Sequence, residues 1–244
     1  MKSLKDMSIL VTGGGSGIGL GTARYCIERG AKVTICGRRE DKIKAAASEL
    51  GDACHGVAAD ITVAADRQKL LGATIDHGGQ LDALVNNAGN MYRGAITELD
   101  ETALQEVFHT NVIAAMMLTG LCTSHLAQRK GAVVFVGSIH TRRAFPGASP
   151  YAATKAAVQG LTRVLAAELG EQKIRVNCLL PGAVFTEINQ RAGLMDDETA
   201  LQRLEGMSDL HALGRIGTTE EIAEAMAYLI CAEWVTGAMI DIDG

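Results

Sequence analysis

Short apolar runs alternate with longer segments of helical periodicity along the whole chain. The short runs are rich in Val, Ile, Leu and Ala and end at glycine or polar residues, which is typical of buried parallel strands. We expect strands at 8–11, 31–36, 55–59, 81–85, 132–136, 174–180 and 238–242. The intervening segments place apolar residues three and four apart, which predicts helices at 16–29, 39–50, 63–76, 97 or 100 to 128, 150–169 and 218–230.

This alternation contains neither an internal repeat nor a linker. It predicts a single α/β domain over residues 1–244, built on one doubly wound parallel sheet. The stretch 183–214 breaks the alternation and is too long for a plain loop, so we expect one or two short helices that cover a site there. Thr218-Thr-Glu-Glu221 resembles a capping box and predicts the start of the last helix.

A glycine-rich turn, Thr12-Gly-Gly-Gly-Ser-Gly-Ile-Gly19, lies between the first strand and the first helix. Its glycines allow a close approach of the backbone to a pyrophosphate, and the helix start offers N–H groups and the positive end of a dipole. The spacing is Gly13-x-x-x-Gly17-x-Gly19 rather than G-x-G-x-x-G, and the turn lacks the lysine of a phosphate-binding P-loop. A dinucleotide site and a plain flexible turn are both compatible with this stretch alone.

The second strand ends at Gly37-Arg38-Arg39. Folds that bind NAD usually place an acid there for the ribose hydroxyls, whereas a nearby arginine accommodates the 2′-phosphate of NADP. A guanidinium suits phosphate because it donates two parallel hydrogen bonds. We expect Arg38 to contact this phosphate, and Arg39 to a lesser degree. The alternative is a solvated basic start of the next helix.

Tyr151 and Lys155 lie four residues apart, on the helix that we expect Ser149 to cap and Pro150 to start. They therefore share one helix face. A free phenol has a pKa of about 10, and a cation held near it favours the phenolate and lowers that value. Such a pair is a general acid/base for an alcohol or a carbonyl, although this short pattern alone also fits an exposed tyrosine and a solvated lysine.

Three further features lie at strand ends or inside a helix. Ser138 follows the fifth strand, and ligands of open α/β sheets bind outside the carboxyl ends of strands. Asn86-Asn-Ala-Gly89 ends the fourth strand with small residues that let a flat ring approach the backbone. Asn111 lies inside a helix, where asparagine is a weak helix former, so we expect it to serve a structural hydrogen bond or a proton relay.

Composition narrows the classes of partner. The formal net charge of −5 gives no electrostatic reason to expect nucleic acid or an anionic membrane as a partner. No signal-peptide core follows Met1, and no apolar run is long enough to span a bilayer. The six cysteines are scattered, with Cys36 and Cys178 in apolar runs, which predicts buried reduced thiols and a cytoplasmic protein. The sequence shows no ligand cluster that would indicate a metal.

The motifs stand in a fixed order: Thr12 to Gly19, Asp60, Asn86 to Gly89, Asn111, Ser138, Tyr151-x-x-x-Lys155 and Pro181-Gly182. This ordered set closely resembles the short-chain dehydrogenase/reductase family, in particular its 3-oxoacyl-reductase-like members, over nearly the whole chain. The resemblance implies a Rossmann-type sheet of seven parallel strands in the order 3-2-1-4-5-6-7. It also implies hydride transfer between a nicotinamide cofactor and a small-molecule ketone or secondary alcohol.

The resemblance assigns roles to four residues in this chemistry. It implies that Tyr151 is the acid/base, and that Lys155 lowers its pKa and binds the nicotinamide ribose. It implies that Ser138 orients the substrate oxygen and that Asn111 supports a proton relay. In this picture the cofactor carries the hydride, while the protein positions the reacting carbon and moves the proton.

The resemblance also implies the cofactor contacts, with the adenine held after the third strand and the nicotinamide amide after the sixth. The expected contacts are Thr12, Gly13, Gly15, Ser16, Gly17, Ile18, Gly19, Arg38, Arg39, Asp60, Ile61, Asn87, Ala88, Gly89, Tyr151, Lys155, Pro181, Gly182, Val184 and Thr186. NADP(H) is the expected cofactor and NAD(H) the alternative. Many NADP-preferring relatives carry a basic residue where this chain has Ser16, so the preference rests on Gly37 and Arg38.

A homotetramer is the expected assembly. The helices that begin near Thr97 and at Pro150 are rich in Ala, Leu and Met beyond one narrow stripe, so each is expected to bury a second face. The family resemblance implies that the same helices pair between subunits. Two departures concern the C-terminal interface: the link 231–237 is shorter than usual, and the sequence ends at Gly244, where the family often has a second glycine.

Other classes of protein fit parts of the pattern. A methyl-donor-binding enzyme would favour an acid after the second strand, and a catalytically silent dinucleotide sensor has no need of the Ser, Tyr and Lys together. A dinucleotide-using epimerase or dehydratase would normally need a larger substrate domain than 183–214. Between Ser138 and Tyr151, the residues expected to border the pocket are His140, Arg142, Arg143 and Phe145. The arginines suit an anionic substrate, but a solvated loop is the preferred interpretation.

Overall fold

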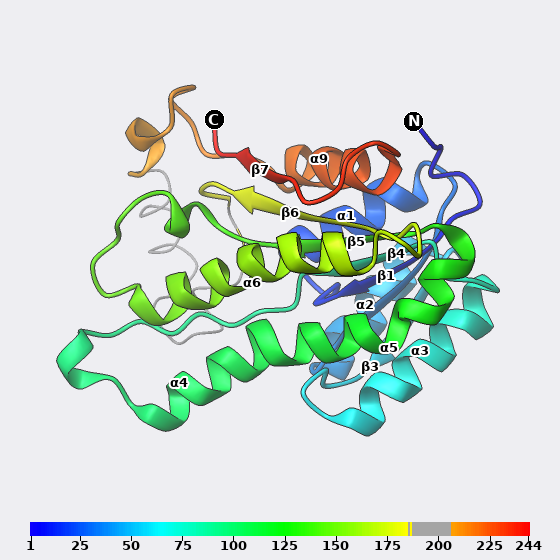
Figure 1. Cartoon of the computed structure of the whole chain (residues 1–244), viewed down its shortest axis with the longest axis horizontal. Coiled ribbons are helices and arrows are strands. Elements are labelled where there is room, and N and C mark those ends of the chain that lie inside the picture. The colour runs from blue at the N-terminus through cyan, green and yellow to red at the C-terminus, as the bar shows by residue number, and fades with distance from the viewer. Residues whose placement is uncertain (185, 187–205) are drawn as a thin grey trace.

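The computed structural model describes residues 1–184, 186 and 206–244. Its centre is a parallel sheet in the order β3-β2-β1-β4-β5-β6-β7, as the family resemblance implied. The strands are β1 Ser8–Thr12, β2 Lys32–Gly37, β3 Cys54–Ala58, β4 Ala83–Asn86, β5 Ala132–Val136, β6 Arg175–Pro181 and β7 Met239–Ile242. Helices return over the sheet between successive strands, so that all the carboxyl ends lie along one edge (Figure 1).

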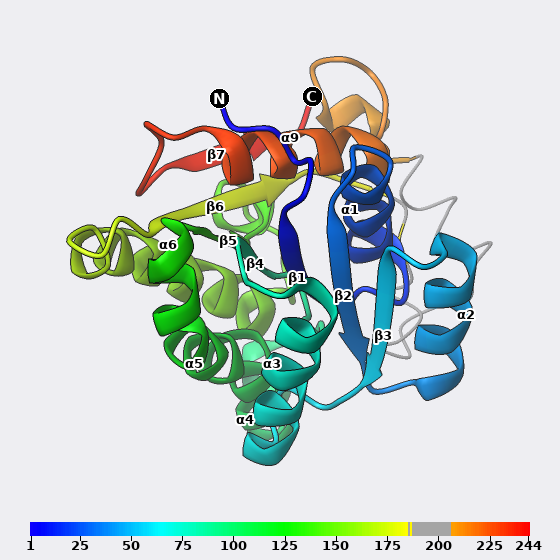
Figure 2. The same ribbon diagram turned by 90° about the vertical axis from the view of Figure 1, so that its right-hand side faces the viewer.

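The helices form two layers, one on each face of the sheet. They are α1 Gly17–Ile27, α2 Glu40–Leu50, α3 Ala64–Gly78, α4 Glu101–Phe108, α5 Ala114–Arg129, α6 Ser149–Glu168 and α9 Thr219–Cys231. Helices α1, α2 and α9 cover one face, and α3, α5 and α6 cover the other (Figure 2). Side chains of β1 alternate between the layers, with Ile9 and Val11 in one core and Leu10 in the other. Burial on both faces explains why the strands read as continuous apolar runs.

The observed elements begin and end within about two residues of the predicted positions. The expected role of Ser149 as a helix cap is wrong, because α6 starts at Ser149 itself and Ala148 is the cap. Pro150 lies in the first turn as predicted, where it removes no intrahelical hydrogen bond. Of the predicted cover at 183–214, the structure describes a 3₁₀ turn at Ser208–Leu210, and 185 and 187–205 lie outside the described residues.

A π-helix, His109–Ile113, joins α4 to α5, so that residues 101–129 form one continuous helical run. By length and apolar composition alone this run could cross a membrane. Leu118, Cys122 and Leu126 on its inner face are fully buried against the sheet, so core packing accounts for that face. All six cysteines are free and buried, as predicted.

The predicted capping box at the start of α9 is present. Thr218 Oγ1 accepts from the backbone N–H of Glu221 at 3.2 Å, and Glu221 Oε2 accepts from the backbone N–H of Thr218 at 2.9 Å. Each side chain thus satisfies a backbone donor that the helix leaves unpaired. Arg215 pairs with the same carboxylate, and these contacts hold the pKa of Glu221 at about 2.

We expect Thr218→Ala to destabilise the protein by about 1 kcal/mol, because the cap acceptor is lost. Thr218→Ser keeps the hydroxyl and serves as the matched control. In a chain of this length, about 1 kcal/mol corresponds to a fall of roughly 2–4 °C in the unfolding midpoint. Thermal unfolding followed by circular dichroism measures the shift. Equal midpoints for the alanine and serine variants would contradict a stabilising cap.

Candidate active site

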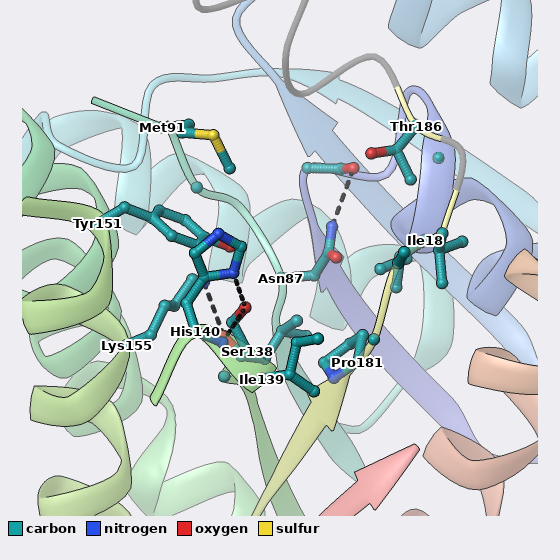
Figure 3. A pocket seen from close by; sticks show the side chains of 18 of the residues that line it. Ile18, Asn87, Met91, Ser138, Ile139, His140, Tyr151, Lys155, Pro181 and Thr186 are labelled. Carbon is teal, nitrogen blue, oxygen red and sulfur yellow. Dashed lines mark hydrogen bonds between the residues drawn. The ribbon is translucent and has the colours of Figure 1, made fainter. Parts of the chain in front are cut away.

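A cavity of about 330 Å³ opens at the carboxyl edge of the sheet. The turn after β1, the ends of β4, β5 and β6, and the first turns of α6 contribute its walls. Figure 3 shows Tyr151 and Lys155 on one side of the cavity and Ile18 and Thr186 on the other. This is the edge at which open α/β sheets bind ligands.

Glycines shape the turn after β1. Gly13 and Gly17 have φ angles of 66° and 55°, in the left-handed region that favours glycine. A Cβ at Gly19 would lie 2.4 Å from the carbonyl oxygen of Gly13, so the first turn of α1 packs this closely only without a side chain. Ser16 is the N-cap residue of α1, and its side chain makes no capping hydrogen bond. The first-turn N–H groups therefore suit an anion such as a pyrophosphate.

Thr12 and Asn87 fasten this turn to the end of β4. Thr12 Oγ1 accepts from the backbone N–H groups of Asn87 at 3.1 Å and Ala88 at 2.9 Å, and donates to the carbonyl of Val85 at 3.3 Å. Asn87 Nδ2 donates to the carbonyls of Thr12 at 2.9 Å and Gly13 at 3.2 Å. The glycine turn and the 87–89 segment, both expected to contact the cofactor, are thus one hydrogen-bonded unit.

A second hollow, of about 230 Å³, lies beside the turn at the end of β2. Arg38 and Arg39 line it together with Gly15 and Ser16, as expected for residues that contact a dinucleotide. Lys42, in the first turn of α2, also lines it. The sequence did not predict a role for Lys42, because nothing in the pattern distinguishes it from other lysines on the exposed face of a helix. None of the described residues that line this hollow is acidic.

The residues expected to contact the nicotinamide line the main cavity, whereas those expected to contact the adenine do not. Pro181, Gly182, Val184 and Thr186 all line the main cavity, as do Asn87, Ala88 and Gly89. Asp60 and Ile61 line neither hollow. The carboxylate of Asp60 accepts from the backbone N–H and the hydroxyl of Thr62, and Ile61 is buried in the core.

Ser138, Tyr151 and Lys155 meet on the wall formed by β5 and α6. Ser138 follows β5 and begins a 3₁₀ turn, while the first turns of α6 carry the other two residues. All three are buried. Lys155 Nζ donates to the carbonyl of Val136 at 2.7 Å and lies 5.5 Å from the centre of the Tyr151 ring. The structure therefore brings these three of the four predicted catalytic residues together.

Burial dominates the electrostatics of this wall. It raises the pKa of Tyr151 to about 12, opposed by a hydrogen bond from Ser138 and by the charge of Arg93. It lowers the pKa of Lys155 to about 8. The structure does not show the expected lowering of the phenol pKa, because desolvation disfavours the phenolate more than Ser138 and Arg93 favour it. Tyr151 is protonated at neutral pH.

Asn111 lies in the π-helix between α4 and α5. Its Nδ2 donates to the carbonyl of Asn90 at 2.9 Å and to Thr154 Oγ1 at 3.0 Å, and its Oδ1 accepts from the backbone N–H of Asn90 at 2.8 Å. Of the two roles left open by the sequence, the structural hydrogen bond is present. It ties the segment after β4 to α6 one residue before Lys155.

The loop between Ser138 and α6 divides into two parts. His140 and Phe145 line the cavity. Arg142 and Arg143 instead pair with Asp241 and Asp243, at 3.2 Å and 3.4 Å.

Arg93, in the irregular segment after β4, also lines the cavity and contacts His140 Nε2 at 3.0 Å. The sequence did not predict a role for Arg93, because a residue in an irregular segment belongs to no motif and no periodic pattern.

Comparisons with known proteins agree with this geometry. The family model for short chain dehydrogenases matches residues 7–197. The chain is 33% identical over 252 residues to a 3-oxoacyl-[acyl-carrier-protein] reductase of Chlamydia muridarum, covering 99% of this chain and 97% of that protein. It is 34% identical over 241 residues to an L-fucose dehydrogenase of Bos taurus, covering 97% and 87%.

A solved structure extends the agreement to three dimensions. The crystal structure of 3-ketoacyl-(acyl-carrier-protein) reductase from Brucella melitensis complexed with NADH matches with a TM-score of 0.90 and 32% identity, covering 99% of this chain and 98% of that one. The family match, the relatives and the fold all point the same way. The chain belongs to the short-chain dehydrogenase/reductase family and is an oxidoreductase that transfers hydride between a nicotinamide dinucleotide and a ketone or secondary alcohol.

Proposed function

We propose that this enzyme prefers NADP(H), uses Tyr151 as its acid/base and works as a homotetramer on a small carbonyl or alcohol substrate. One observation carries the proton chemistry: Ser138, Tyr151 and Lys155 line a single cavity opposite the glycine turn. The proposal for the cofactor rests on the basic hollow at the end of β2. The proposal for the assembly rests on exposed apolar side chains of α5 and α6.

The described residues fit a dinucleotide. The glycine turn packs closely on the 87–89 segment, since a Cβ at Gly13 would lie 2.9 Å from Ala88 Cα, and both stretches line the main cavity. This turn and the start of α1 would hold the pyrophosphate, and Pro181, Val184 and Thr186 would hold the nicotinamide. When bound, the nicotinamide supplies or accepts the hydride.

The residues of the chain move the proton. With its pKa raised to about 12, the phenol of Tyr151 is protonated at neutral pH, which is the state that reduction of a carbonyl requires of an acid. Ser138 lies beside it and can donate a hydrogen bond to the substrate oxygen. Lys155 supplies the cation that favours the phenolate once the proton has left. In the reverse direction the same groups receive the proton of an alcohol.

The basic hollow favours NADP(H). Arg38, Arg39 and Lys42 line it, and Gly37 stands where an acid would bind the ribose hydroxyls and repel a 2′-phosphate. A charge-assisted hydrogen bond contributes roughly 1.5–3 kcal/mol, which corresponds to about a tenfold to hundredfold preference. Lys42 provides a further cation that compensates for the absence of a basic residue at Ser16.

We expect Tyr151→Phe to reduce kcat by roughly 10²–10⁴-fold, because the acid/base is lost, while the affinity for cofactor stays unchanged. Steady-state kinetics and a fluorescence titration with NADPH measure the two quantities. Tyr228→Phe, on the exposed side of α9, is the matched control. Residual activity within tenfold of the parent would disprove the assignment of Tyr151.

We expect the parent to show a higher kcat/KM with NADP(H), and Gly37→Asp/Arg38→Ala to shift the preference toward NAD(H). An aspartate at position 37 requires the buried side chain of Ile43 to shift by a few tenths of an ångström, because its Cδ1 and Cγ1 would lie 3.1 Å and 3.4 Å from the new Cβ. Lys44→Ala removes a cation of α2 that pairs with Glu40 and does not line the hollow. That control should leave the preference unchanged. A parent that prefers NAD(H), or a double variant with the parental ratio, would contradict the proposal.

The outer face of the 109–129 run and of α6 carries exposed apolar side chains. Ile113, Met116, Met117 and Val164 are each 44–54% exposed in the single chain. We expect light scattering at micromolar concentration to give the mass of a tetramer, and Met117→Glu to shift it toward smaller species. Val63→Glu, at the start of α3, is the control and should not change the mass. A monomeric parent would refute the proposed assembly.

A further inference from the structure

Three side chains form a chain of hydrogen bonds along the cavity wall. An Nη2 of Arg93 lies 3.0 Å from His140 Nε2. His140 Nδ1 lies 3.0 Å from Ser138 Oγ, and the backbone N–H of His140 also donates to Ser138 Oγ, at 3.2 Å. The dashed lines between His140 and Ser138 in Figure 3 mark the last two contacts. Arg93 comes from the segment after β4 and Ser138 follows β5, so these hydrogen bonds connect the ends of the two strands along the cavity wall.

The arginine determines the direction of these hydrogen bonds. A guanidinium is charged at all ordinary pH values and has donors only, so His140 Nε2 must be the acceptor in the contact with Arg93. An Nε2 that accepts carries no proton. The proton of the neutral ring is then on Nδ1, and the contact with Ser138 is a donation from Nδ1–H to Oγ.

The hydroxyl of Ser138 has both of its acceptor positions occupied. A hydroxyl has two lone pairs and one proton. Both lone pairs of Ser138 Oγ are engaged, one by His140 Nδ1–H and one by the backbone N–H of the same residue. The hydroxyl therefore has no lone pair left to accept a hydrogen bond, and it can only donate its own proton. It can do so on the side of the cavity where Tyr151 lies.

The surroundings hold the histidine ring in this state. The ring lies edge-on to Tyr151, with centres 5.2 Å apart and planes at 87°, and it packs on Phe145 with centres 4.4 Å apart. Among the residues that the structure describes, the charged groups that face it are the cations Arg93 and Lys155, and the neighbouring phenol is neutral. Burial and these two cations lower the pKa of His140 to about 4, so the ring stays neutral at physiological pH.

We propose that Arg93 and His140 are positioning residues that make Ser138 an obligate hydrogen-bond donor to the substrate oxygen. The inference rests on the proposed role of this cavity in carbonyl and alcohol chemistry. Since Ser138 cannot accept, the hydroxyl proton of a bound alcohol can be passed only to Tyr151. The substrate oxygen therefore has one orientation in both directions of the reaction, with a lone pair toward Ser138 and the transferred proton toward Tyr151.

The tautomer is directly measurable and requires no turnover. Protein labelled with ¹⁵N-histidine gives ring nitrogen shifts that distinguish Nδ1–H from Nε2–H, and His140→Asn identifies the signals that belong to His140. We expect His140 in the parent to be neutral and in the Nδ1–H form at pH 7. In Arg93→Met we expect the Nε2–H form to become populated, because the donor to Nε2 is lost. A parental Nε2–H tautomer, or a protonated ring at pH 7, would overturn the proposal.

Steady-state kinetics test whether the function of Ser138 depends on its hydrogen bond from His140. His140→Ala should lower kcat by about two- to tenfold, as expected for one neutral hydrogen bond, without changing the KM for the cofactor. His140→Asn can place an N–H near the position of Nδ1 and should restore kcat to within about twofold of the parent. His55→Asn, on the exposed side of β3, is the matched control and should behave as the parent.

A double-mutant cycle links the two residues. If Arg93 acts through His140, then Arg93→Met/His140→Ala should be no slower than His140→Ala alone, since interacting residues are not additive. Additive losses, or an asparagine variant no better than the alanine variant, would overturn the inference. A parent that reduces no carbonyl with either cofactor would instead refute the proposed function, and the tautomer measurement would still stand by itself.

Discussion

The hydroxyl of Thr12 organises the cofactor side of the molecule. It is buried between β1 and β4, and it uses its full capacity by donating to Val85 and accepting from the N–H groups of Asn87 and Ala88. A residue without this oxygen would leave the backbone N–H of Ala88 without its acceptor, which typically costs about 1–3 kcal/mol where water does not replace it, whereas the N–H of Asn87 also donates to the carbonyl of Val85 at 3.1 Å. The turn after β1 cannot slide either, because Gly13 and Gly19 pack without space for a Cβ.

The substrate side is governed by desolvation. Lys155 keeps its ammonium buried by donating to the carbonyl of Val136, which also fixes the end of β5 beside α6. Burial moves the pKa of Lys155 down and that of Tyr151 up, so both groups are driven toward their neutral forms. A pair whose ionisation is held back in this way responds strongly to any new charge or hydrogen bond in the cavity.

The sequence was sufficient to predict the strands, the helices and the residues that meet at the site, because those depend on periodicity and on ordered motifs. It was not sufficient for Arg93 and Lys42, whose positions come from an irregular segment and from the packing of α2 against the glycine turn. The direction of the Tyr151 pKa shift also escaped it, since spacing shows that a cation is near but not how dry the site is. Ser149 was misplaced by one residue at a helix end, where boundaries are least determined by pattern.

Because of the π-helix at His109–Ile113, the number of residues between α4 and α5 is a determinant of the site. A π turn holds one residue more than an α turn, and such turns are frequent at functional sites. Removing one residue here would turn the π turn into an α turn, so that 101–129 becomes a regular α-helix while α4 keeps its orientation relative to α5. Asn111 would then leave its contacts with Asn90 and Thr154. A deletion in this turn is therefore not equivalent to a substitution, because it removes the local widening of the helix that places Asn111 among these partners.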